Sequence, residues 1–169
     1  MKIIYADPPW KHDVFISNRR SADKHYEMME LEDIKNYDIP ECENGILFLW
    51  SIACMLPEAL EVMESWGFKY KTHYIWDKEI IGLGWWCRCQ HELLLVGTKG
   101  KVKAPEMSKL VSSVYHERRR EHSRKPSYFR NMINKYYPDA EKIELFAREK
   151  PVGWKIETNE ELSSINDWI

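Results

Sequence analysis

The chain has 169 residues, of which 44% are hydrophobic and 31% are charged, so one globular domain with a substantial core is expected. A formal net charge of −2 excludes a strongly basic nucleic-acid-binding domain, although aromatic residues, at 13%, offer surfaces on which bases stack. The N-terminus leads straight into an apolar run and no run reaches membrane-spanning length, which predicts a cytoplasmic protein without signal peptide or membrane segment.

The first apolar run, KIIYA (2–6), predicts a short buried strand, and DPPW (7–10) follows it directly. Proline fixes φ, lacks a backbone N–H and disfavours helix in the residue before it, so a stiff turn is expected here. Open α/β sheets bind ligands at this end of their strands. The alternative is an ordinary strand-ending turn with a solvated Asp7 and a core Trp10.

Further elements follow in alternation along the chain. Apolar runs at 45–50, 72–77, 92–98 and 142–147 predict strands buried on both faces, and 154–158 a short strand. Helices are predicted over 31–37, over a segment after 56 that stops at Gly67, and from Pro126 onward. The alternation predicts a parallel sheet with crossover helices. Long loops at roughly 8–25, 78–91 and 99–125 are predicted to be binding loops.

Two of these loops contain candidate nucleic-acid contacts. Trp85 and Trp86 lie beside Arg88, and either packing or contact with a base or partner would explain them. Arg118, Arg119 and Arg120 form a basic run that is either a solvated loop or a phosphate-contacting segment. Cys87 and Cys89 are too closely spaced for a usual zinc pair, so reduced, structural cysteines and no metal site are predicted.

The acid–proline turn fits one kind of chemistry. An exocyclic amine of a nucleobase is a poor nucleophile because its lone pair is delocalised into the ring. The Asp7 carboxylate and the Pro8 carbonyl could accept its two hydrogens and draw the nitrogen towards tetrahedral geometry. Trp10 offers a flat face for an extruded base, and a methyl group on a sulfonium would be the electrophile.

These residues resemble a known signature. D-P-P-[WYF] marks amino methyltransferases that act on adenine N6, and S-P-P-[WY] marks those that act on cytosine N4. The chain resembles the MT-A70 family of S-adenosylmethionine-dependent adenine-N6 methyltransferases over most of its length. The similar blocks, in order after DPPW, are HYEMMELEDIK (25–35), GILFLW (45–50), PEALEVMESWGFKY (57–70), QHELLLVGTKG (90–100), SRKP (123–126) and KIELFAR (142–148).

The resemblance implies an α/β, Rossmann-like methyltransferase fold that forms a single domain over residues 1–169. The sheet would be mostly parallel, with helices on both faces and a permuted order that places the catalytic motif N-terminal and the cofactor-binding strand C-terminal. Asp7, Pro8, Pro9 and Trp10 would form the catalytic turn. The implied cofactor-binding residues are Asp7, Lys125 (on the methionine carboxylate), Glu144, Phe146, Arg148 and Asn159 (on the ribose). The implied substrate-binding residues are Trp10, Tyr26, Trp85, Arg88, Arg118, Arg119 and Arg120.

The expected function is therefore methyl transfer from S-adenosylmethionine to adenine N6, in DNA of bacterial or phage type rather than in RNA. Two alternatives stay open: a non-catalytic nucleic-acid-binding subunit of a methyltransferase complex, and a cytosine-N4 methyltransferase. Because no separate target-recognition domain is evident, specificity is expected to come from the three loops or from a homodimeric or heterodimeric partner.

Overall fold

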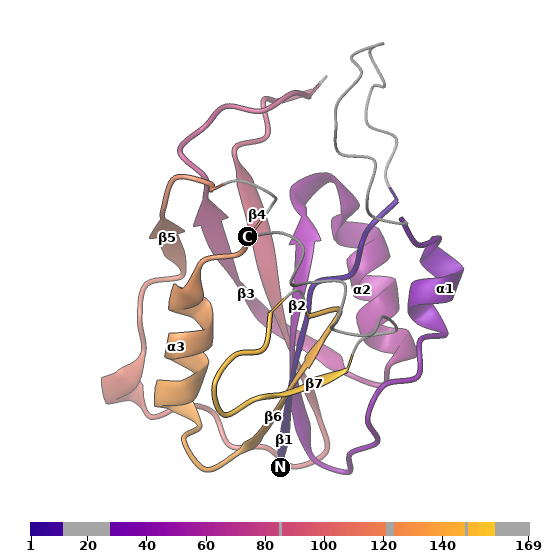
Figure 1. The fold of residues 1–169 in the computed structure, drawn as a ribbon, viewed down its shortest axis with the longest axis vertical. Coiled ribbons are helices and arrows are strands. Elements are labelled where there is room, and N and C mark those ends of the chain that lie inside the picture. The colour runs from indigo at the N-terminus through magenta and orange to yellow at the C-terminus, as the bar shows by residue number, and fades with distance from the viewer. Residues whose placement is uncertain (12–27, 85, 121–123, 148, 158–169) are drawn as a thin grey trace.

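The computed structural model describes residues 1–11, 28–84, 86–120, 124–147 and 149–157, which fold around one mixed β-sheet (Figure 1). Its strand order is β5-β3-β4-β2-β1-β6-β7. The strands are β1 (Lys2–Ala6), β2 (Gly45–Ile52), β3 (Lys69–Asp77), β4 (His91–Lys99), β5 (Val114–His116), β6 (Glu141–Leu145) and β7 (Lys155–Glu157). The helices are α1 (Leu31–Lys35), α2 (Leu56–Ser65) and α3 (Ser127–Tyr136), with short 3₁₀ turns η1 (Ala53–Met55) and η2 (Met107–Lys109).

The sheet is mostly parallel, as predicted. β1 lies between β2 and β6 and is parallel to both, β7 is parallel to β6, and β5 is parallel to β3. β4 is antiparallel to its neighbours β2 and β3, and it follows the connection that was predicted to be a long loop. The described residues between β3 and β4 contain no helix, and without a crossover the chain returns as an antiparallel neighbour.

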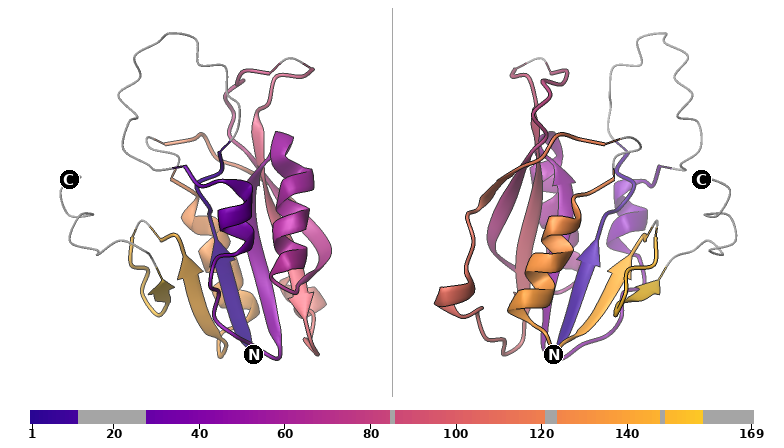
Figure 2. Two further views of the ribbon diagram at one scale, coloured as in Figure 1. Left: turned by 90° about the vertical axis from the view of Figure 1, so that its right-hand side faces the viewer. Right: turned by 60° about the vertical axis from the view of Figure 1, so that its left-hand side comes forward.

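Helices cover both faces of the sheet, which confirms the predicted Rossmann-like fold class (Figures 1 and 2). Successive strand residues point to opposite faces, so the continuous apolar runs in β1 and β2 supply two cores. On one face, α1 and α2 pack on a cluster that includes Ile4, Leu47, Leu49, Val62 and Met63. On the other, α3 packs on a cluster that includes Ile3, Tyr5, Phe48, Trp50, Phe129 and Ile133.

Local differences from the prediction occur mainly near one edge of the sheet. Thr72 is exposed and only Trp76 of the run 72–77 is buried, because β5 pairs with β3 only at Ile75–Asp77. β5 itself was not predicted, since three residues inside a long polar segment carry no readable alternation. Pro126 directly precedes α3 instead of being its first residue.

One edge of the sheet concentrates the predicted site. The parallel strands β1, β2, β3 and β6 end at this edge, and the antiparallel β4 begins there; we call it the carboxyl edge. The connection from β3 to β4 rises beyond the carboxyl edge, whereas the N-terminus lies at the opposite one (Figures 1 and 2). No helix within the described residues is both long and apolar enough to cross a bilayer.

Candidate active site

The DPPW segment forms a held turn at the end of β1. Ala6 is the last residue of the strand, and the Trp10 N–H donates to the Pro8 carbonyl at 2.9 Å. The Met29 N–H donates to the Pro9 carbonyl, also at 2.9 Å, which fastens the turn to the segment before α1. The Asp7 side chain keeps 16% of its surface exposed, so the carboxylate reaches the carboxyl edge without being sealed in the core.

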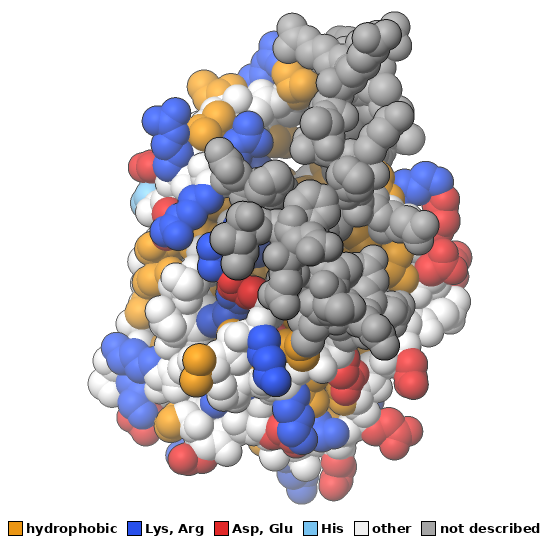
Figure 3. All heavy atoms as spheres, in the orientation of Figure 1, with side chains coloured by type: hydrophobic (Ala, Val, Ile, Leu, Met, Phe, Trp, Pro, Cys, Tyr) orange, Lys and Arg blue, Asp and Glu red, His pale blue; other side chains and the backbone are white. Residues whose placement is uncertain are grey.

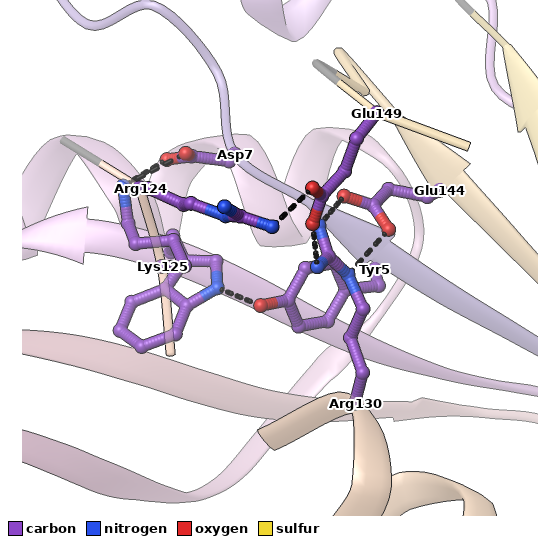
Figure 4. Close-up of polar contacts among 8 residues, drawn as sticks. Tyr5, Asp7, Arg124, Lys125, Arg130, Glu144 and Glu149 are labelled. Atoms are coloured by element: carbon purple, nitrogen blue, oxygen red, sulfur yellow. Dashed lines mark hydrogen bonds and ion pairs between the residues drawn. The ribbon is translucent and has the colours of Figure 1, made fainter. Parts of the chain in front are cut away.

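Lys125 binds the Asp7 carboxylate directly (Figure 4). Its Nζ lies 2.8 Å from Oδ1 and 2.7 Å from Oδ2, although 118 positions separate the two residues. Lys125 Nζ also lies 3.4 Å from a Glu92 carboxylate oxygen and 5.4 Å from the centre of the Trp50 ring. Such charge-assisted contacts, largely shielded from water, fix the positions of both side chains.

The contacts of Lys125 belong to a longer series of alternating charges. Lys78 Nζ lies 3.2 Å from the other carboxylate oxygen of Glu92, so Lys78, Glu92, Lys125 and Asp7 form a continuous ion-pair chain. Burial disfavours the charged form of Glu92, but Lys125 and Lys78 outweigh it and hold the pKa of that carboxyl below its usual value. The ion-pair chain therefore links the start of the β3–β4 connection to the catalytic turn.

A second, partly buried network lies beside the first, around Arg130 of α3. Its guanidinium binds both carboxylate oxygens of Glu144 at 2.6 and 2.8 Å and Glu149 at 2.6 Å, while Arg124 binds the other oxygen of Glu149 at 2.7 Å (Figure 4). The Arg130 guanidinium lies 5.6 Å from the centre of the Tyr5 ring. Burial raises the pKa of Tyr5, so its phenol stays protonated. This network holds α3, which begins just after Lys125, against β1 and β6.

The predicted cofactor-binding strand ends in an unusual backbone conformation. Phe146 directly follows β6 and has a φ of 58°, in the left-handed region that side-chain-bearing residues seldom adopt. Its N–H donates to the Glu157 carbonyl at 3.1 Å, and its ring packs 4.5 Å from that of Tyr37. Backbone strain of this kind occurs preferentially at ligand sites.

Trp10 is mostly covered in this structure. Only 7% of its surface is exposed, and its indole Nε1 donates to the Trp50 carbonyl at 2.9 Å. The ring therefore contributes to the core on the α1–α2 face, and its predicted stacking on a base stays a prediction.

The structure brings some predicted site residues together and separates others. Asp7 and Lys125 touch, and Glu144 lies in the adjoining Arg130 network. Arg88, Arg118, Arg119 and Arg120 are exposed, and the Arg119 N–H donates to the Lys78 carbonyl at 3.2 Å, so the basic run lies along the base of the β3–β4 connection. Tyr26, Trp85, Arg148 and Asn159 lie outside the described residues.

The sequence reading missed six residues that complete these networks: Tyr5, Lys78, Glu92, Arg124, Arg130 and Glu149. Glu92 could have been found, because a carboxylate at the start of an apolar strand needs a buried partner. Arg130 gave no such signal, since an Arg on a predicted amphipathic helix is usually solvated.

Other kinds of site are less evident in the described part of the chain. No group of three or more His, Cys, Asp or Glu side chains there is placed to hold a metal ion. A cavity of about 330 Å³ lies at the opposite edge of the sheet, between Met1, Lys103 and Tyr137, and contains none of the predicted site residues.

Comparisons with known proteins agree with this geometry. The MT-A70 family model matches residues 1–159. The chain belongs to the MT-A70 family. Its predicted membership, and with it the prediction that the chain is a methyltransferase, is confirmed.

Two relatives show how far the similarity extends. The type II methyltransferase M.MunI of a Mycoplasma species is 35% identical over 90% of this chain and 74% of its own length. The human N(6)-adenosine-methyltransferase catalytic subunit METTL3 is 29% identical over 86% of this chain. Only 25% of METTL3 is covered, so the shared part is a fraction of that protein.

Proposed function

We propose that the chain, as one domain, transfers a methyl group from S-adenosylmethionine to the N6 amine of adenine in nucleic acid. The observation that carries the proposal is the Asp7 carboxylate, presented at the carboxyl edge by a proline turn and joined there to Lys125. Membership in the MT-A70 family and a relative named for N(6)-adenosine methylation support the choice of amine.

The residues at this edge fit such a cofactor. S-adenosylmethionine carries a carboxylate, which Lys125 would pair, and it supplies a methyl group on a positively charged sulfur. Phe146, strained at the end of β6, would line the same side of the proposed cofactor pocket. Because both Glu144 oxygens are already bound by Arg130, we propose that Glu144 shapes the pocket through Arg130 rather than by contacting the cofactor itself.

The catalytic turn would hold the amine with two acceptors. A carboxylate offers about four acceptor positions, so Asp7 can accept an amine hydrogen while it keeps Lys125 or after Lys125 turns to the cofactor carboxylate. The Pro8 carbonyl accepts one hydrogen bond from the Trp10 N–H and has a second lone pair for the amine. The turn is fastened through Pro9 and Trp10, so both acceptors are positioned before the amine arrives.

DNA is the proposed substrate class. The chain covers 74% of a bacterial relative named as a type II methyltransferase, but only 25% of the relative named for adenosine methylation. Exposed arginines beside the carboxyl edge, Arg118 to Arg120, would contact phosphates. Because the proposed substrate is DNA of bacterial or phage type, a cytoplasmic location is part of the proposal.

The test uses wild type and Asp7→Ala with labelled S-adenosylmethionine and either DNA or RNA, followed by mass spectrometry of the digested nucleosides. We expect N6-methyladenine from the wild type, mostly in DNA, and a loss of about a hundredfold or more in the variant, the size typical for removing one transition-state contact. Circular dichroism should show that the variant is folded. Methyl transfer by the variant at the wild-type rate would exclude the acceptor role.

The same experiment separates the two alternatives. If the product is N4-methylcytosine, the target base is cytosine and not adenine. Failure of the wild type to bind S-adenosylmethionine in calorimetry, with nucleic acid bound normally, would identify a non-catalytic partner subunit.

A further inference from the structure

The connection from β3 to β4 carries a group of exposed hydrophobic side chains at the carboxyl edge. We call residues 78–84 and 86–90 the β3–β4 hairpin. Trp86 is fully exposed, and Ile81 and Leu83 expose 70% and 69% of their surfaces. Exposing several large apolar side chains on one narrow projection is unfavourable, so such groups usually mark a binding surface.

The hairpin is narrow, and glycines make it so. The Lys78 N–H donates to the Gln90 carbonyl at 2.9 Å, and the Gly82 N–H donates to the Cys89 carbonyl at 3.0 Å. A Cβ at Gly82 would lie 2.5 Å from the Cys89 carbonyl oxygen, and one at Gly84 would collide with that of Cys87. Only glycine permits this close approach of the two chain segments, and a narrow projection can enter a nucleic-acid groove.

The base of the hairpin is clamped by one side chain. Asp77 Oδ1 accepts hydrogen bonds from the Glu79 N–H at 2.9 Å and from Gln90 Nε2 at 2.7 Å. Its other oxygen lies 3.0 Å from His116 Nδ1 of β5. The two ends of the hairpin and β5 are therefore held together, so the exposed side chains stand on a rigid support.

The surroundings of the hairpin favour nucleic acid as the occupant. Arg88 lies on the hairpin itself, and Arg118 to Arg120 run beside its base through the Arg119–Lys78 hydrogen bond. Figure 3 shows Lys and Arg side chains with hydrophobic ones between them at the upper left, where Figure 1 places this hairpin and β5. Apolar side chains flanked by cations suit the base stack and the phosphates of a nucleic acid.

The hairpin is also joined to the catalytic turn. Lys78, at its first position, begins the ion-pair chain that runs through Glu92 and Lys125 to Asp7. The base of the hairpin and the catalytic turn therefore share the carboxyl edge, which a nucleobase whose amine binds Asp7 would have to approach.

We propose that the β3–β4 hairpin is a wedge for duplex DNA, in which Trp86, supported by Leu83 and Ile81, enters the stack beside the target adenine and takes the place that the adenine vacates. The proposal rests on the proposed function. It makes the hairpin a specificity element for paired substrate, because an adenine in a single strand has little stacking or pairing to lose.

The test compares wild type, Trp86→Ala, Trp86→Phe and the control Met107→Ala, which changes another exposed hydrophobic residue, on η2 and outside the hairpin. Methyl transfer is measured on unmethylated genomic DNA, native and heat-denatured. We expect Trp86→Ala to lose about tenfold or more on native DNA, the range of one base–aromatic stack, and little on denatured DNA. Trp86→Phe and Met107→Ala should stay close to wild type. An equal loss on both substrates would overturn the wedge.

A second measurement does not depend on methyl transfer. Duplex DNA with some adenines replaced by 2-aminopurine becomes brighter when those bases unstack. Wild type should raise the fluorescence and Trp86→Ala should not, while anisotropy shows both proteins bound. If the wild type unstacks 2-aminopurine but transfers no methyl group, the proposed function fails and the wedge stands. If Trp86→Ala unstacks the base as well as wild type does, or only dissociates a dimer of the protein, the wedge is wrong.

Discussion

Asp7 binds Lys125 in the structure and would also bind the substrate amine in the proposed reaction. Lys125 engages both of its oxygens, and Glu92 competes for Lys125 from the other side. An approaching cofactor carboxylate would enter this competition as a third anion. Since Lys125 is only 9% exposed, a small movement of its Nζ changes which anion is neutralised. We therefore expect cofactor binding to make Asp7 more available to the amine.

The position of Glu92 in the ion-pair chain leads to a pH prediction. Its pKa lies below the ordinary value of 4.5, because Lys125 and Lys78 outweigh the burial that opposes ionisation. Its stabilisation is therefore complete above that ordinary value and is lost as the pH falls through the lower folded value. Glu92→Gln should lower the free energy of unfolding by about 2 kcal/mol at pH 7, and the difference should shrink in acid.

Urea titrations from pH 7 down to pH 3.5 measure this difference. Glu64→Gln, an exposed site on α2, is the matched control and should show little effect at any pH. A deficit in Glu92→Gln that stays constant across the acidic range would show that the carboxylate charge is not what stabilises the fold.

At the scale of single elements, the end of β6 gives a backbone prediction. Alanine is normally more stabilising than glycine, but Phe146 has a φ of 58°, where a Cβ is strained. Phe146→Ala and Phe146→Gly both remove the ring that packs on Tyr37, so they differ only in the backbone. We expect the glycine variant to be more stable by about 1 kcal/mol in chemical denaturation. A more stable alanine variant would contradict the left-handed conformation.

The elements were predictable where a strand was a continuous apolar run or a helix had apolar residues at helical spacing. β1, β2, β6 and the amphipathic α2 and α3 matched their apolar patterns closely, because each buries a face or both faces in a core. The direction of β4 was not predictable from its own residues. An apolar run such as LLL at 93–95 is buried equally well in either direction, and only the helix-free connection before it decides.

At the scale of the whole molecule, the charge is small but unevenly placed. The formal net charge is −2, yet Arg118, Arg119 and Arg120 are all exposed along the base of the hairpin. Changing all three to Ala should weaken DNA binding and reduce the slope of log K against log salt by about 0.9 for each phosphate that the protein no longer neutralises.

Fluorescence anisotropy at several salt concentrations measures that slope. The control removes three other exposed cations, Lys101, Lys103 and Lys135, which lie after β4 and late in α3, towards the opposite edge of the sheet. An equal change of slope in both triple variants would mean that the protein attracts DNA through its overall charge and not through the arginine run.

The site was predictable only in part, and the reason lies in sequence distance. Asp7 was singled out because an acid and two prolines follow an apolar strand and resemble the D-P-P-W signature, and Lys125 followed from the same resemblance; their roles in the site stay predictions. The partners that bind them from elsewhere in the fold, Glu92 with Lys78 and Glu144 with Arg130, are set by strand order and helix position. Such pairings between distant residues leave no periodic trace in a single sequence.

The central place of β1 has a consequence for biosynthesis. Lys2 pairs with Gly45 on one side and with Glu141 on the other, so one side of β1 stays unpaired until β6, far along the chain, has been made. Closing so long a loop slows folding, and an aggregation-prone apolar strand stays unpaired on the nascent chain in the meantime. The same separation delays the ion pair between Asp7 and Lys125, because a nascent chain that ends before residue 125 has no lysine to place opposite the carboxylate.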